Sequence, residues 1–125
     1  MAGGTAGAAG GPPVIRESFT VLPCPKKQIS TLDMEGCSEH ALLQSDAKVN
    51  ALAARIWKVI PAGGRSAFLS GERSWLAYRA SSCNAEASKY IGGTLRPVAF
   101  LGCEASRNNA HLTDLGGTLQ ILTHP

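Results

Sequence analysis

The sequence contains no long apolar run. No segment approaches the roughly 18 consecutive apolar residues that a membrane-spanning helix needs, and the first residues lack the basic stretch and apolar core of an export signal. We therefore expect no membrane span. Hydrophobic residues make up 44% of the 125 residues and charged residues 17%, which is typical of one small globular domain.

Basic clusters are also missing. The 12 lysines and arginines exceed the 9 aspartates and glutamates, which gives a net charge of +3, but they are spread along the chain. Aromatic residues, at 6% of the chain, do not alternate with a basic run as they do in many nucleic-acid-binding surfaces. The sequence therefore argues against nucleic acid as a partner.

The four cysteines form no CxxC pair of the kind used in metal binding or redox chemistry. Cys24, Cys37, Cys83 and Cys103 are an even number in a short chain, which predicts two disulfides. Because disulfides persist in oxidising compartments, we expect a secreted or cell-envelope protein whose export signal has been trimmed from this chain. A cytosolic protein with four free thiols is the alternative.

The chain divides into three parts by composition. Residues 1–22 are rich in glycine, alanine and proline and lack periodicity, so we expect a flexible tail. Residues 23–116 carry the helical patterns and form the expected domain. Residues 117–125 are expected to form a loosely held C-terminal tail.

Two helical stripes lie within the expected domain. From Ser38 to Ile60, and again from Phe68 to Tyr90, apolar residues recur every three or four positions, which predicts two amphipathic helices. The segment Pro61–Gly64 separates them as a short turn, so the helices should be antiparallel neighbours. A shorter stripe from Ala105 to Leu115 allows a third helix. The sequence thus predicts an all-α fold, an antiparallel helical hairpin plus a short third helix, cross-linked by two disulfides.

The short turn also determines which residues face each other. With its centre between Ala62 and Gly63, residues whose numbers sum to about 125 lie at the same height on the two helices. Asp46 and Arg79 form such a pair on the facing stripes, so we expect a structural ion pair between them. The core residues expected on these stripes are Trp75, Phe68, Val49 and Ile56, with Val49 opposite Leu76 and Ile56 opposite Leu69.

The helical register bears on the disulfide pairing as well. All four cysteines lie at the same end of the hairpin, so height alone leaves three connectivities open. Cys37 points about 140° away from the centre of the stripe on its own helix, whereas Cys83 lies within its stripe. This difference favours the pairs Cys24–Cys37 and Cys83–Cys103.

Residues able to carry catalysis or bind a metal are sparse. His40 and His111 have no adjacent nucleophile motif, and Glu72 and Glu86 lie about 21 Å apart along a helix, too far for a pair of glycosidase carboxylates. A zinc site through these two histidines with Cys37 and Cys103 rests only on the weak CSEH spacing. We therefore expect no enzyme activity, no metal and no cofactor.

Three segments resemble the LprI-like family of secreted domains, which is named after a lysozyme-inhibiting lipoprotein. They are MEGCSEHALLQSDAKVN, FLSGERSWLAYRASSC and YIGGTLRPVAFLGC, and the likeness covers residues 24–115. The spacing of tryptophan, arginine and cysteine in the second segment is its most specific part. The resemblance implies a small, mainly helical, disulfide-linked protein exported to the envelope or the medium. Glu72 stands in place of the family's usual glutamine, and Asn109 in place of a second arginine that often follows Arg107.

The resemblance also implies a protein-binding module, with lysozyme as the named partner. Lysozyme is cationic, so a net charge of +3 opposes its approach at long range, and local carboxylates would have to compensate. We take Glu72, Glu86 and Arg107 as candidate partner-binding residues, Glu72 because no opposite charge lies at its height in the hairpin. The alternative function is a structural or interaction domain of the cell envelope with a different partner.

Overall fold

The computed structural model describes residues 10–124 and contains three long helices, with no strand element among these residues. The helices are α1 (Thr31–Val59), α2 (Arg65–Ala87) and α3 (Leu95–Thr123), and the 3₁₀ turns η1 (Ala62–Gly64) and η2 (Ser88–Tyr90) precede α2 and α3. The all-α fold is therefore confirmed. No helix within the described range combines the length and the apolar character that crossing a membrane requires.

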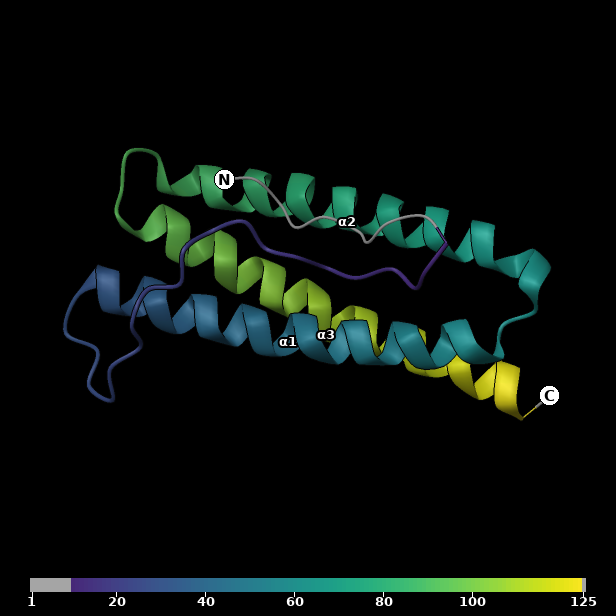
Figure 1. Ribbon diagram of the computed structural model, residues 1–125. Helices are drawn as coiled ribbons and strands as arrows, with labels where there is room; N and C mark the ends of the chain where they lie inside the picture. The colour runs from purple at the N-terminus through teal and green to yellow at the C-terminus, as the bar shows by residue number, and fades with distance from the viewer. Residues whose placement is uncertain (1–9, 125) are drawn as a thin grey trace.

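Capping side chains explain where α1 begins and ends. The Ser30 Oγ accepts a hydrogen bond from the backbone N–H of Asp33 at 3.1 Å, which satisfies one of the free N–H groups of the first turn. At the other end Pro61 follows the helix, and the Arg65 side chain donates to the carbonyl of Trp57 at 2.9 Å. The chain reverses within this short turn, so α1 and α2 run antiparallel (Figure 1).

The third helix is longer than the short helix that the sequence predicts. α3 has 29 residues, as many as α1, and it includes residues 117–123, which were expected to be a loose tail. Pro97 does not break it, because a proline in the first turn removes an N–H that has no helical partner. The glycines at 116 and 117 are tolerated because Leu115 and Leu119 are buried against α1. Tertiary packing thus outweighs the low helix propensity of glycine.

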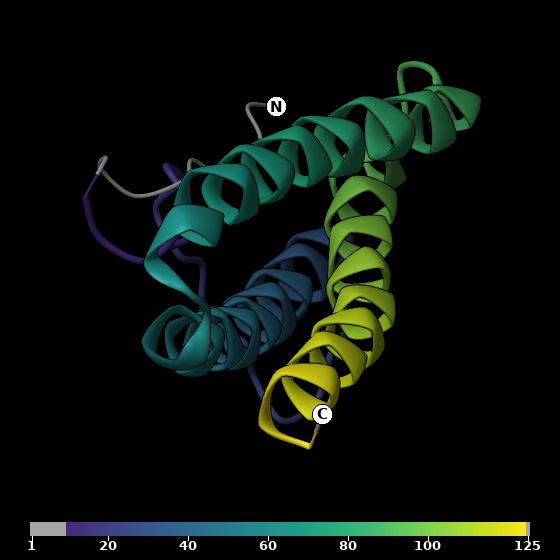
Figure 2. The ribbon, with the colours of Figure 1, turned by 90° about the vertical axis from the view of Figure 1, so that its right-hand side faces the viewer.

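The helices do not form the closely packed hairpin that we expected. α3 packs against both α1 and α2, whereas α1 and α2 are not closely packed on each other. Residues 10–22 run between α1 and α2 as an extended segment, drawn in purple in Figure 1, and the end-on view in Figure 2 shows the same arrangement. We call residues 10–22 the strap.

The strap differs from the flexible tail that its composition predicts. The backbone N–H of Ile15 donates to the Oδ1 of Asn50 on α1 at 2.7 Å, and the Asn50 Nδ2 donates back to the Ile15 carbonyl at 3.1 Å. Pro13 is buried, and Ile15 packs against the apolar core. Prolines and a lack of helical period suit an extended segment held by a groove as well as they suit a tail. Residues 1–9 of the expected tail lie outside the described residues.

The expected disulfide pairs are both confirmed. Cys24–Cys37 ties the chain just after the strap to the start of α1, and Cys83–Cys103 ties α2 to α3. Two apolar clusters flank the middle of the molecule. One contains Val49, Ile56, Leu115 and Leu119, and the other contains Cys83, Ala87 and Phe100.

The expected core residues occupy different depths. Val49 and Ile56 are buried, and Ile56 packs with leucines of α3 where we expected Leu69 of α2. Phe68 is half-buried and packs against the same cluster. Trp75 is also half-buried and lies outside both clusters.

Gly36 marks the closest approach between α1 and the chain that leaves the strap. A Cβ atom at this position would overlap the backbone carbonyl group of Pro23. Gly36 is buried and precedes Cys37, whose disulfide fixes this crossing. Only glycine therefore allows the segment around Pro23 to pass so close to the helix.

Gly36→Ala should destabilise the protein by about 1–3 kcal/mol, because the added methyl group meets backbone that the neighbouring disulfide holds in place. Gly71 on α2 is the matched control, since a Cβ atom there meets nothing within 4 Å. Gly71→Ala should be neutral or stabilise by about 0.5–1 kcal/mol. Denaturant unfolding of both variants measures the difference, and equal effects would contradict the close approach at Gly36.

Candidate functional site

The centre of the molecule holds a buried arginine with three carboxyl groups around it. The Arg79 side chain, on α2, is fully buried. Its Nη1 lies 2.9 Å from Asp46 Oδ1 of α1, its Nη2 lies 2.9 Å from Glu17 Oε2 of the strap, and its Nε lies 3.1 Å from Glu104 Oε2 of α3. We call these four residues the arginine cluster. The expected pair of Asp46 and Arg79 is present, and one guanidinium joins three helices and the strap.

Neutral polar groups add hydrogen bonds to the arginine cluster. The Asn108 Oδ1 accepts from Arg79 Nη1 at 3.0 Å, and its Nδ2 donates to Asp46 Oδ1 and to Ser45 Oγ, each at 2.8 Å. The Ser45 Oγ donates in turn to the carbonyl of Leu42 at 2.9 Å. Asn108 and Ser45 are both buried, so this network fixes the rotation of α3 relative to α1.

The arginine cluster holds three carboxyl groups but only one guanidinium. The pKa values of two of these carboxyl groups, Glu17 and Glu104, are raised. Burial raises the pKa of Glu17 to about 7, with a further rise from Asp46 that Arg79 only partly opposes. Burial also raises the pKa of Glu104 to about 7, although Arg79 lowers it. Burial alone would lower the pKa of Arg79, but the carboxylates around it raise it. Near neutral pH, Glu17 and Glu104 are therefore each partly protonated, whereas Arg79 keeps its positive charge.

We expected the Glu72 carboxylate to be available to a partner, but in the structure it pairs with a residue of α3. Its Oε2 lies 2.8 Å from the Nε2 of His111 on α3, and its side chain is only 12% exposed. The His111 ring stacks on the indole of Trp75, with ring centroids 3.8 Å apart and planes 9° from parallel. Trp75 in turn lies 5.9 Å from the Arg79 guanidinium. Glu72 thus belongs to the interior contacts between α2 and α3, which the two-helix register did not include.

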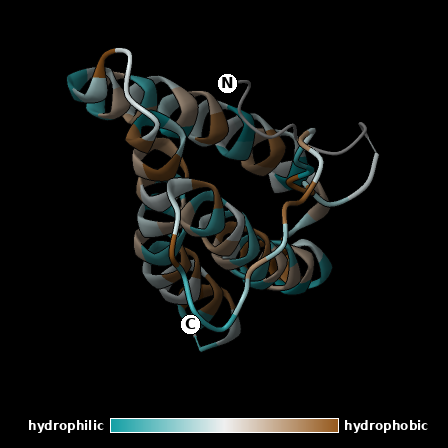
Figure 3. Ribbon diagram, turned by 90° about the vertical axis from the view of Figure 1, so that its left-hand side faces the viewer, coloured by the Kyte–Doolittle hydropathy of each residue, from teal (hydrophilic) through white to brown (hydrophobic). Residues whose placement is uncertain are grey.

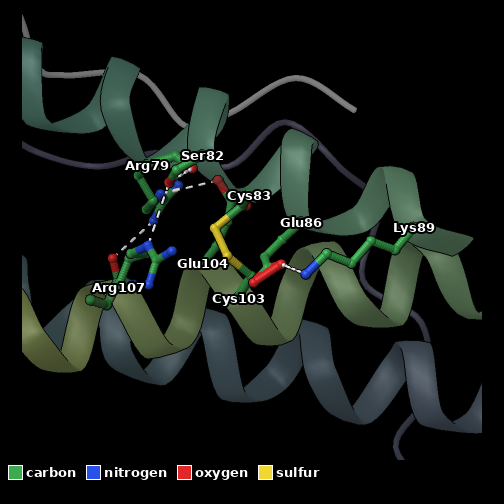
Figure 4. The surroundings of a disulfide bond; sticks show 9 residues. Arg79, Ser82, Cys83, Glu86, Lys89, Cys103, Glu104 and Arg107 are labelled. Atoms are coloured by element: carbon green, nitrogen blue, oxygen red, sulfur yellow. Dashed lines mark hydrogen bonds and ion pairs between the residues drawn. A yellow bond between two sulfur atoms is a disulfide. The ribbon is translucent and has the colours of Figure 1, made fainter.

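Glu86 and Arg107 lie on α2 and α3, close to the Cys83–Cys103 disulfide (Figure 4). Glu86 is exposed, and its Oε2 pairs with the Nζ of Lys89 at 2.7 Å. The half-exposed Arg107 directs its Nε toward Ser82 Oγ, at 3.4 Å. Of the three candidate partner-binding residues, Glu86 is therefore the most accessible.

The residues weighed for a zinc site are engaged in other contacts. Both cysteines of the set are in disulfides and offer no thiolate. His40 lies 3.0 Å from the carbonyl of Leu22 through its Nε2, and His111 contacts Glu72. Across residues 10–124 there is no group of three or more histidine, cysteine, aspartate or glutamate side chains arranged to hold a metal ion.

Two members of the arginine cluster were not anticipated from the sequence. Glu104 follows the helical spacing of Leu101, Asn108 and Leu115, all buried on α3, so a longer third stripe would have revealed it. Glu17 lies in a segment without periodicity, and no sequence signal places it beside Arg79.

Arg79→Ala should destabilise the fold by about 3–5 kcal/mol, because the buried carboxyl groups would lose their cation. Asp46→Ala should cause a loss of the same order, since Arg79 and Asn108 would lose a shared acceptor. Arg73 is exposed on the same helix, and Arg73→Ala should change stability by less than about 0.5 kcal/mol. Chemical denaturation of the three variants measures these values. Stability unaltered in Arg79→Ala would mean that the cluster does not hold the fold together.

The raised pKa values predict a fold that is more stable in acid than at neutral pH. The pKa of Glu17 and of Glu104 is 4.5 when unperturbed and about 7 in the fold. Between these pH values the folded chain therefore binds more protons than the unfolded chain. The contribution of these two groups to the free energy of unfolding should be fully present below about pH 4.5 and should be lost toward pH 7, by up to about 1.4 kcal/mol per pH unit for each group. Denaturant unfolding across this interval measures the slope, and Glu104→Gln should reduce it. Stability that rises over the same interval would contradict the raised pKa values.

Apolar surface gathers at one end of the molecule, where α1 and α3 begin. We call residues 26–35 and 86–97 the turn end, and Figure 3 faces it. Six of the ten exposed large hydrophobic side chains in the described range belong to it, so this is the main apolar surface outside the core. They are Ile29, Leu32, Met34, Tyr90, Ile91 and Leu95. An open hollow between Leu32, Glu35, Gly93 and Pro97 joins its two halves.

The chain matches one protein family over most of its length. The family model described as lysozyme inhibitor LprI matches residues 24–115, from the first cysteine to the middle of α3. No curated protein and no solved structure matches the chain significantly. The matched range contains both disulfides and three of the four residues of the arginine cluster, while Glu17 of the strap lies before it. The chain belongs to the LprI lysozyme inhibitor family.

Proposed function

We propose that this protein is a non-catalytic binding module that works outside the cytoplasm and inhibits lysozyme. The match of residues 24–115 to the lysozyme inhibitor family carries the proposal. The two disulfides and the lack of a free cysteine support an oxidising compartment. Such a role requires a rigid surface, and the disulfide between α2 and α3 braces the helices on either side of the turn that joins them.

The turn end is the surface that we assign to the enzyme. Ile91, just before the turn glycine Gly92, is 85% exposed, and Leu32 on the start of α1 is 60% exposed. A projecting apolar turn suits a concave substrate cleft, since a few buried apolar side chains supply most of the affinity in many interfaces. Glu86 lies on the same end, where it lines a hollow with Tyr90 and with its ion-pair partner Lys89. A cationic enzyme would have to displace Lys89 to use this carboxylate.

Charge does not favour this contact overall. The net charge is +3, and four exposed basic residues also lie on the turn end, namely Lys26, Lys27, Lys89 and Arg96. Lysozyme binding would therefore rest on apolar burial more than on attraction between net charges. The same charge balance favours a second candidate function, an interaction domain of the cell envelope that binds a less basic partner.

Purified oxidised protein should reduce the turnover of bacterial cell walls by lysozyme in a dose-dependent way, and reduction of its disulfides should abolish the effect. Ile91→Ser should raise the inhibition constant by about 10-fold or more, because a buried isoleucine supplies about 1.5–3 kcal/mol. Ile121→Ser is the matched control, since Ile121 is 72% exposed near the opposite end of α3.

The outcomes separate the candidate functions. No inhibition at a large molar excess would discard lysozyme and leave the envelope interaction domain. Inhibition that Ile91→Ser and Ile121→Ser weaken equally, or that neither variant weakens, would retain lysozyme as the partner but exclude the turn end as its surface.

A further inference from the structure

The strap is held by few polar contacts, and one of them depends on charge. Toward its start, Ile15 exchanges two hydrogen bonds with Asn50. At its end the N–H of Leu22 donates to Glu39 Oε1 at 2.7 Å, and the Leu22 carbonyl lies 3.0 Å from His40 Nε2. Between these points the Glu17 carboxyl group reaches Arg79, where its side chain is only 3% exposed. The strap therefore docks by inserting an ionisable side chain into the interior of the molecule.

Glu17 enters a space where the cation already has two partners. Asp46 from α1 and Glu104 from α3 contact Arg79, and both are buried. The other groups near Arg79 are the neutral Asn108 and the indole of Trp75. An ionised Glu17 would thus add a negative charge to a site that is already neutralised, and burial of an unbalanced charge is costly.

A proton removes this conflict and adds a hydrogen bond. The Asp46 Oδ2 atom is buried without a hydrogen-bond donor among the described residues. A protonated Glu17 is a donor as well as an acceptor, so it can serve Asp46 while it still accepts from Arg79. The docked strap therefore favours the protonated carboxyl group, whereas the undocked strap in water does not.

We propose that the strap is a proton-dependent latch, clamped between α1 and α2 in acid by protonated Glu17 and released toward neutral pH. Release would uncover the groove beneath the strap. Val49, Ala53 and Leu76 line it together with Trp75 and Glu72, the latter paired with His111. The apolar side chains of this groove, close to the Arg79 guanidinium, would then be exposed and could make contacts that the docked strap prevents.

The pH window follows from the two states of Glu17. Its pKa is 4.5 when unperturbed and about 7 in the docked strap. Docking is thus tightest below about pH 4.5, weakens as the pH rises to about 7, and changes little above that value. This order reverses the usual behaviour of a salt bridge between a carboxylate and an arginine, which is lost in acid.

Hydrogen exchange of the full-length oxidised protein tests the latch. The reporters are the amides of Ile15 and Leu22, which donate to side chains of α1 and not to a helix of their own. Their protection factors, corrected for the intrinsic effect of pH, should fall at least about tenfold between pH 5 and pH 7.5. Buried helical amides of α1 and α3 should remain more protected and lose less over the same interval.

Variants of Glu17 and of its neighbour Asp46 identify the proton. Glu17→Gln keeps a hydrogen-bonding side chain without the titration, so strap protection should become nearly independent of pH. Asp46→Asn removes the neighbouring carboxylate and should also weaken the dependence. Glu86→Gln is the matched control, because Glu86 is an exposed carboxylate of α2 that pairs with Lys89, and this variant should keep the dependence of the unmodified chain.

Three results would overturn the latch. The first is strap protection that does not change with pH. The second is an equal loss at the strap and helical amides, because the strap would then open only when the whole chain unfolds. The third is a pH dependence of strap protection in Glu17→Gln that equals that of the unmodified chain. Should Glu17→Gln fail to fold, the same result in Asp46→Asn would overturn the latch.

Discussion

A buried guanidinium constrains how every part of this molecule can be placed. Arginine carries five N–H donors in a rigid plane and cannot lose its charge, so a fully buried arginine needs acceptors from several directions. A single neighbouring helix cannot supply them. The acceptors of Arg79 come from α1, α3 and the strap, and this requirement explains why α3 packs against both other helices and why the strap lies between α1 and α2. The apolar clusters then fill the space on either side of it.

The arginine cluster contributes more to uniqueness than to net stability. Desolvation of four ionisable groups consumes much of what their attraction provides, and apolar residues of similar volume would often be as stable. A charged cluster nevertheless penalises every wrong register, because a shift of one residue would leave a carboxylate or the guanidinium unpaired. The Cys83–Cys103 disulfide restricts the helix register as well, because it links α2 to α3 covalently close to the cluster. The arginine cluster and the Cys83–Cys103 disulfide thus both fix how α2 and α3 pack near the centre of the fold.

The sequence predicts the helices well because their signals are local. The turn at Pro61–Gly64 and the stripes on either side of it are continuous in the chain, and the pair of Asp46 and Arg79 follows from their spacing. The disulfide pairing follows from the same helical geometry. What the local signals could not supply is the position of α3, so the partner of Glu72 was missed even though His111 had been noted.

The strap shows a different limit of sequence analysis. An extended segment has no period of its own, and its contacts are chosen by the groove that receives it. Composition alone therefore describes a tail, while the backbone of Ile15 and the carboxyl group of Glu17 hold it to two helices. Glycine and proline in such a segment are compatible with either outcome, because they limit regular structure and not packing.

The proposed function and the proposed latch use two surfaces with different chemistry. The turn end is exposed and carries six large apolar side chains, whereas the groove under the strap is covered by the chain itself. Both are positioned by helices that meet at Arg79, so the cluster supports binding without contacting a partner. The family match includes the turn end from residue 26 onward and most of the cluster but not the strap. The latch is therefore a property of this chain that the family assignment does not imply.

A double-mutant cycle between Arg79 and Glu104 measures whether the buried guanidinium ties the helices together. The variants are Arg79→Met, Glu104→Leu and their combination, which replace the charges by apolar groups of similar size. Arg79→Met leaves the buried Glu104 carboxyl group without its cation, whereas Glu104→Leu leaves Arg79 paired with Asp46 and Glu17. If the guanidinium ties the fold together, removing Glu104 as well should relieve part of the loss in Arg79→Met, and the combination should recover at least about 1 kcal/mol relative to the sum of the single losses. Losses that simply add, with a coupling near zero, would show that the two groups do not act as a unit and would contradict the account.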